Sequence, residues 1–164
     1  MDKSLIEKQN GNFANTVLGA VPSVVYNEDC VEGLKRFSDN YFDLAIVDPP
    51  YGIGMDSTHF KTKTSNAKPT DYGKKEWDSK KPIDEYWEQL FRVSKNQIVW
   101  GGNYFVENLT NSSCWVVWDK DNGDSIHADC ELAWTSFKTG VRKIKWLWHG
   151  MRQQNMKDKE KRIH

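Results

Sequence analysis

Residues 42–51 read Phe-Asp-Leu-Ala-Ile-Val-Asp-Pro-Pro-Tyr, an apolar run that ends at a carboxylate followed by two prolines. Because both faces of Leu44 to Val47 are apolar, the run predicts a buried strand of a parallel sheet. The prolines have no N–H group for the ladder, so the strand cannot continue past Asp48. Ligands of open α/β sheets bind beyond the carboxyl ends of strands. A carboxylate, exposed carbonyls and the ring of Tyr51 at this corner suit a flat, amine-bearing substrate such as a nucleobase.

The segment before this strand completes a predicted β-α-β unit. Residues 24–26 are β-prone, and apolar residues recur at helical spacing between Val31 and Phe37. Asp29 stands at the N-cap position of that helix. Two strands separated by one helix predict parallel pairing through a right-handed crossover.

The chain after this unit alternates between helix and strand. A proline opens a predicted helix over roughly 83–95, whose apolar residues form one stripe. Gln97 to Trp100 predicts a buried strand, and Asn103 is a candidate cap for a short helix that ends at residue 109. Cys114 to Trp118 predicts a third core strand.

The last predicted elements are two strands, Glu131 to Phe137 and Arg142 to Trp148, joined at residues 138–140 as an antiparallel hairpin. The whole pattern predicts a single α/β domain over residues 1–164, with a mixed, mostly parallel sheet.

Composition narrows the class of protein. Lys and Arg total 23, as do Asp and Glu, so a histone-like polybasic binder is disfavoured. Cys30, Cys114 and Cys130 are odd in number and form no C-x-x-C pair, which disfavours a disulfide framework or a zinc site. No leader pattern and no long apolar run is present. We therefore expect a cytoplasmic location, with no metal and no membrane partner.

Three polar segments flank or interrupt these elements. Residues 1–21 are expected to form a loosely ordered lead-in, residues 52–82 a long loop, and residues 149–164 a basic tail. A loop of this length is typical of a functional lid or a disordered piece. Its lysines are either phosphate contacts or ordinary solvated side chains. The candidate phosphate contacts are Lys61, Lys63, Lys74 and Lys75.

Several of these segments together resemble the DNA amino-methyltransferases. The resemblance is carried by Tyr26 to Cys30, Phe42 to Tyr51, Trp100 to Asn103, Cys114 to Lys120, Asp129 to Phe137 and the end of the chain, Lys161 to His164. Members of this family transfer a methyl group from S-adenosylmethionine to adenine N6 or cytosine N4 in DNA. The resemblance implies a Rossmann-like methyltransferase fold and favours adenine, because Asp rather than Ser stands at position 48.

The resemblance assigns a role to each residue of the 48–51 motif. The amine of a nucleobase is a poor nucleophile, and two hydrogen-bond acceptors help to align its lone pair on the methyl group. Asp48 supplies one acceptor and the carbonyl of Pro49 the other, while Pro50 keeps the corner free of donors. Tyr51 is suited to stack on a base that has been flipped out of the duplex. The transfer is a direct displacement, so positioning and electrostatics carry the catalysis.

Cofactor contacts are expected from two acids. In the family an acidic residue near Asp29 lies beside the adenosine of the cofactor, although a helix cap explains Asp29 equally well. Asp48 also lies near the cofactor. Gly52-Ile53-Gly54 is not a dinucleotide loop, because Ser57 replaces the third glycine. His127 has no second ligand at metal spacing.

The chain also departs from the family. A complete member with this order of motifs continues into a Pro-Thr-Gln-Lys-Pro-like segment and a glycine-rich cofactor loop, so these residues resemble an N-terminal catalytic half. We expect weak cofactor binding, little activity alone, a C-terminal half as partner and, through an uncovered sheet edge, a possible homodimer. A non-catalytic DNA-binding fragment, a cytosine-N4 enzyme and an RNA or protein methyltransferase are the alternatives.

Overall fold

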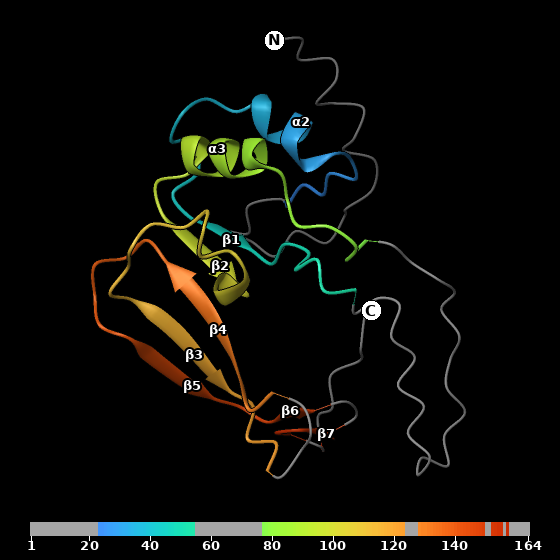
Figure 1. Ribbon diagram of the computed structural model, residues 1–164, viewed down its shortest axis with the longest axis vertical. Coiled ribbons are helices and arrows are strands. Elements are labelled where there is room, and N and C mark those ends of the chain that lie inside the picture. Colours follow the sequence, from blue (N-terminus) through green and yellow to red (C-terminus); the bar gives the residue numbers. More distant parts are fainter. Residues whose placement is uncertain (1–22, 55–76, 124–127, 150–151, 156, 158–164) are drawn as a thin grey trace, which may run out of the picture.

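The computed structural model describes residues 23–54, 77–123, 128–149, 152–155 and 157, which form an α/β fold built on a five-stranded sheet (Figure 1). Its strand order is β1-β2-β4-β3-β5, and β6 and β7 form a separate two-stranded sheet. The elements are α2 (Cys30–Lys35), β1 (Ala45–Val47), α3 (Asp84–Val93), β2 (Gln97–Trp100), the 3₁₀ helix η2 (Gly102–Tyr104), β3 (Trp115–Asp119), β4 (Cys130–Thr135), β5 (Arg142–Lys145), β6 (Trp148–His149) and β7 (Arg152–Gln153).

The five-stranded sheet is mixed, as the sequence predicted, but it is not mostly parallel, because two of its four strand pairs are parallel and two are antiparallel. β1 pairs in parallel with β2, and β3 pairs in parallel with β5. β4 lies between β2 and β3 and is antiparallel to both. The carboxyl ends of β1, β2, β3 and β5 therefore lie at one edge of the sheet, together with the amino end of β4. This shared edge is where the fold collects polar side chains from several strands.

The predicted C-terminal hairpin is wrong. β4 and β5 are not neighbours, because β3 lies between them and pairs with both. β4 has a strand on each side already, so β5 adds to the open side of β3. Across that seam Lys143 makes an ion pair of 2.8 Å with Asp119 on β3. The alternation of side chains predicted the strand but carried no information on its neighbour.

The strand predicted at residues 24–26 does not form either. These residues join no ladder, and Tyr26 instead packs edge-on against Phe37 at 6.5 Å, beneath the guanidinium of Arg36. The parallel β-α-β unit of the chain is β1-α3-β2. Three β-prone residues were not enough, because the ring of Tyr26 packs in the turn after α2 while Val24 and Val25 stay exposed.

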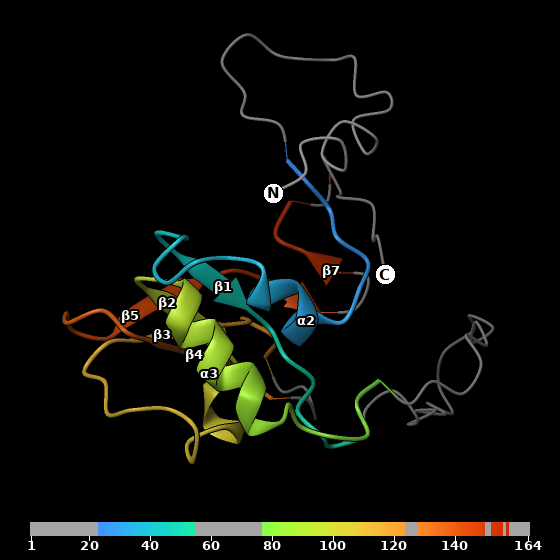
Figure 2. The same ribbon diagram turned by 90° about the horizontal axis from the view of Figure 1, so that it is seen from above.

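Both described α-helices lie on the same side of the sheet, next to β1 and β2 (Figure 1 and Figure 2). α2 begins at Asp29 as predicted, since Asp29 Oδ1 accepts hydrogen bonds from the backbone N–H groups of Val31 and Glu32. α3 buries the predicted apolar stripe, with Leu90 only 2% exposed. Lys35 joins the two helices through a 2.7 Å ion pair with Glu85. The core therefore lies between these helices and one face of the sheet.

β1 is less buried than its composition predicted. Val47 packs against the core, but Ile46 is 62% exposed and Leu44 is 41% exposed. Burial of both faces needs a layer on each side of the sheet, and both described α-helices lie on one side. Within the described part of the chain β1 also has only one neighbouring strand, so β1 is an edge strand. No helix in that part is long and apolar enough to cross a membrane.

Candidate functional site

The corner at residues 48–51 leaves β1 at the shared edge of the sheet. Val47 is the last residue of the strand and lies opposite Val99 on β2. Asp48 is exposed, whereas Pro49 is buried and Pro50 is half-buried. The prolines thus anchor the corner in the fold while the carboxylate faces outward. The expected position of this motif, beyond the carboxyl end of a parallel strand, agrees with the structure.

Tyr51 turns back onto Asp48. Its hydroxyl donates a 2.7 Å hydrogen bond to Asp48 Oδ1. Partial burial, reinforced by that bond, raises the pKa of the Tyr51 hydroxyl well above its ordinary value. The hydroxyl is therefore protonated at neutral pH and acts as a donor. The structure brings together the carboxylate and the ring that the sequence placed at the site.

Two aromatic rings from the chain after β2 enclose Tyr51. Tyr104 stacks on its ring with centroids 4.7 Å apart and planes inclined by 14°, and Phe105 meets it edge-on at 6.0 Å. Neither residue was predicted as part of the site. The sequence feature that lies next to these two residues is the Trp-Gly-Gly-Asn stretch after a buried strand. That stretch was used only as part of the resemblance to a family.

Gly101 is the backbone position that lets Tyr51 sit there. Its φ is +64°, and a Cβ atom at this position would lie 2.2 Å from Cε1 of Tyr51. Only glycine allows both this left-handed conformation and this approach. The predicted helix over 103–109 is wrong, because the turn at Gly101 starts η2, which spans Gly102–Tyr104, and Asn103 caps nothing.

The segment that follows Tyr51 is held by a residue distant in sequence. The backbone N–H of Gly52 donates to Asp78 Oδ1 at 2.9 Å, and that of Gly54 donates to the carbonyl of Asp78 at 3.0 Å. Both glycines have positive φ angles, +70° and +67°. Asp78 itself is 1% exposed. This contact was not expected, since a single acid in a polar segment gives no sequence signal.

Charged residues of other strands reach the same edge. Glu131 near the start of β4 pairs with Lys120, and its negative charge contributes to the raised pKa of Tyr51. The ammonium of Lys120 also lies 5.7 Å from the ring centre of Trp118. The neighbourhood of Tyr51 thus combines aromatic rings with carboxylates, a lining that favours groups bearing N–H donors.

Of the remaining predicted site residues, the structure describes only Asp29. Asp29 Oδ1 is occupied as the cap of α2, so the helix-cap interpretation is confirmed, while a cofactor contact stays a prediction. Lys61, Lys63, Lys74, Lys75 and His127 lie outside the described residues, as do residues 1–21. The long loop at 52–82 and the tail at 149–164 are described only in part. Across the described ranges, no three His, Cys, Asp or Glu side chains are grouped to hold a metal ion.

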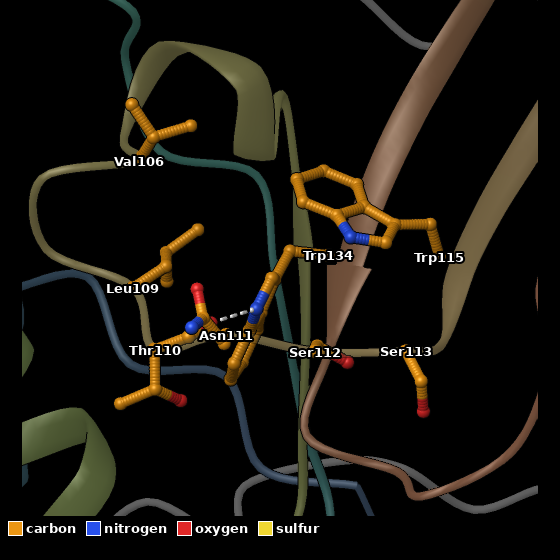
Figure 3. A pocket seen from close by; sticks show the side chains of 8 residues that line it. All are labelled: Val106, Leu109, Thr110, Asn111, Ser112, Ser113, Trp115 and Trp134. Atoms are coloured by element: carbon orange, nitrogen blue, oxygen red, sulfur yellow. Dashed lines mark hydrogen bonds between the residues drawn. The ribbon is translucent and has the colours of Figure 1, made fainter.

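A cavity of about 340 Å³ lies beside the loop that follows η2 (Figure 3). Trp134 on β4 closes one side and donates a 2.8 Å hydrogen bond to the carbonyl of Thr110. Hydroxyl and amide side chains from residues 110–113 line another. Neither Asp48 nor Tyr51 lines this cavity, so it is separate from the corner at the end of β1.

Comparison with known proteins gives one distant likeness. No family model matches the chain. Over 126 residues the chain is 28% identical to the GMP synthase (glutamine-hydrolysing) of Listeria monocytogenes serotype 4b, strain F2365. That match covers 71% of the chain, and the chain spans only 23% of the length of this curated relative.

Proposed function

We propose that this chain is the catalytic portion of a DNA amino-methyltransferase that acts on adenine N6. The observation that carries the proposal is the 2.7 Å hydrogen bond from the Tyr51 hydroxyl to the Asp48 carboxylate, beyond the carboxyl end of a strand that pairs in parallel with its neighbour in a mixed sheet. An acceptor beside an aromatic ring, at the edge where α/β sheets bind ligands, suits a flat amine. The finer fold assignment, a Rossmann-like methyltransferase, belongs to the same proposal.

Asp48 can accept from a base amine while it keeps its bond to Tyr51. A carboxylate has about four acceptor positions, and the Tyr51 hydroxyl uses one of them. The buried Pro49 brings its carbonyl next to the carboxylate in the chain, and neither proline adds a competing donor. Two acceptors on one amine orient its lone pair, which is the positioning that a direct methyl transfer needs.

Tyr51 supplies the stacking surface in this proposal. Stacking of a base on an aromatic side chain is worth about 1–3 kcal/mol, comparable to the few kcal/mol needed to flip a base out of the duplex. Because the ring of Tyr51 is fixed by Tyr104, Phe105 and Gly101, little side-chain freedom is lost when a base binds.

S-adenosylmethionine is the methyl donor in this proposal, and the described residues do not form a complete site for it. Asp29 is engaged as a helix cap. The space beside Gly52 does not form a binding site for a cofactor either, since a Cβ atom there would lie 3.0 Å from the backbone nitrogen of Lys81. This supports the expectation that the chain alone binds the cofactor weakly. Asp29 and Asp48 stay candidate contacts.

The decisive experiment incubates the chain with unmethylated duplex DNA and S-adenosylmethionine and measures methylated nucleosides by mass spectrometry. We expect N6-methyldeoxyadenosine at a low level, lost in Asp48→Asn. Asp43→Asn is the matched control, because Asp43 precedes the same strand and pairs with Lys95 on the surface. N4-methyldeoxycytidine would reassign the base, and methylated RNA or protein would reassign the substrate. If neither methylation nor binding of DNA with 2-aminopurine at the target position is detected, the proposal is wrong.

A further inference from the structure

Asp78 is a buried carboxylate in an otherwise exposed stretch. Trp77, Ser79 and Lys80 are exposed, while Asp78 is 1% exposed. Burial of a carboxylate is costly unless donors satisfy it. One of its donors is the backbone N–H of Gly52, the residue next to Tyr51, at 2.9 Å. The position of Asp78 therefore fixes the chain immediately after the candidate stacking ring.

Lys81 contacts the residues whose rings pack against Tyr51. Its ammonium donates to the carbonyl of Tyr104 at 2.6 Å and to Glu107 Oε1 at 2.8 Å. It also lies 5.9 Å from the ring centre of Phe105. Tyr104 and Phe105 are the two rings that contact Tyr51. Lys81 thus ties the aromatic surroundings of Tyr51 to the segment that carries Asp78.

We infer that residues 78–81, here named the 78–81 bracket, position Tyr51 for stacking on a flipped base, with Asp78 and Lys81 as positioning residues. The inference rests on the proposed function and extends it to residues that touch neither base nor cofactor. Gly52 and Gly54 have φ angles that glycine adopts freely, so without the bracket the chain after Tyr51 would have many other conformations. The bracket removes that freedom before substrate arrives.

The test compares Asp78→Ala, Asp78→Asn and Lys81→Met in the full chain, with Lys95→Ala as the control. Lys95 makes a surface ion pair of 2.7 Å with Asp43, similar to the 2.8 Å pair of Lys81 with Glu107. The first readout is nitration of Tyr51 by tetranitromethane, measured by peptide mass spectrometry against Tyr41, which is 60% exposed. We expect faster nitration of Tyr51 in Asp78→Ala and Lys81→Met, and rates close to the unaltered chain in Asp78→Asn, since Asn keeps an acceptor for Gly52.

The second readout is methyl transfer. Misplacement of a reacting group by about 1 Å can lower a rate roughly 100-fold. We expect Asp78→Ala to lower kcat by about that factor with little change in KM for DNA. Nitration of Tyr51 unchanged in both Asp78→Ala and Lys81→Met would overturn the inference, whatever the methylation result. A nitration pattern as expected, with neither methyl transfer nor binding of DNA that carries 2-aminopurine by any form, would instead overturn the proposed function and leave the positioning of Tyr51 by the bracket established.

Discussion

Replacement of Gly101 by alanine tests the packing of the candidate site directly. The new Cβ atom would lie 2.2 Å from Tyr51 Cε1, whereas ordinary contact begins at 3.4 Å, so the ring must retreat by about 1.2 Å. That retreat disrupts the stack on Tyr104, worth about 1 kcal/mol. It also disrupts the hydrogen bond to Asp48, worth about 1 kcal/mol at this half-exposed position. The positive φ adds backbone strain of about 1–2 kcal/mol.

Gly123 provides a matched control, because its φ is +59° and a Cβ atom there meets nothing within 4 Å. Gly123→Ala therefore carries the strain without the clash. We expect Gly101→Ala to be less stable than Gly123→Ala by about 2 kcal/mol, which corresponds to a Tm difference of roughly 4–8 °C. Urea unfolding and thermal melts measure this difference. Methyl transfer, if detected for the unaltered chain, should fall about 100-fold in Gly101→Ala only. Equal stability of the two variants would refute the contact between Gly101 and Tyr51.

Three further predictions concern the scaffold. Asp29→Ala should lower the free energy of unfolding by about 1 kcal/mol, because two backbone N–H groups lose their acceptor; Asp29→Asn, measured by the same urea titration, should lose less. Leu90→Ala should cost about 2–5 kcal/mol, since its side chain is 2% exposed, and a loss under 1 kcal/mol would mean that α3 does not pack as described. Hydrogen bonds from basic side chains lower the pKa values of four carboxylates, three exposed and one half-buried, below their ordinary range. The stability that these carboxylates contribute is therefore present above their ordinary pKa values and is lost as the pH falls through the pKa values of the folded state. The Tm measured from pH 7 to 3 should begin to fall near pH 4.5, less steeply in high salt, and a constant Tm would contradict this reasoning. The four residues are Glu28, Asp43, Glu107 and Asp119.

Sequence patterns located most elements of this fold but not their neighbours. The strand at Gln97–Trp100 and the helix at Asp84–Val93 follow from local periodicity and form as expected. The neighbour of β5 does not follow from periodicity, because pairing depends on which strand edges are already occupied. For the same reason the exposure of Ile46 was missed: a run of apolar residues does not tell whether a second layer covers it.

The candidate site shows a similar division. Asp48 and Tyr51 were predicted because a proline corner after an apolar strand has a local signal. Tyr104 and Asp78 were missed, since Tyr104 contacts Tyr51 and Asp78 contacts Gly52 only through the tertiary fold, from 53 and 26 positions farther along the chain. The close approach of the Tyr51 ring to Gly101 was also not predicted, because the glycine pair indicated only the end of a strand.

The contacts of Asp78 with Gly52 and Gly54 have a consequence for engineering and divergence of the chain. Asp78 lies 26 residues after Gly52 and 24 residues after Gly54. The two ends of the intervening stretch are therefore held together whatever its length. A doubling of loop length adds only about 0.6 kcal/mol of closure entropy. The stretch between these contacts should therefore accept insertions, deletions or a transplanted recognition segment without movement of Tyr51. Under the proposed function, such a position lets substrate preference change while the candidate site beside it stays fixed.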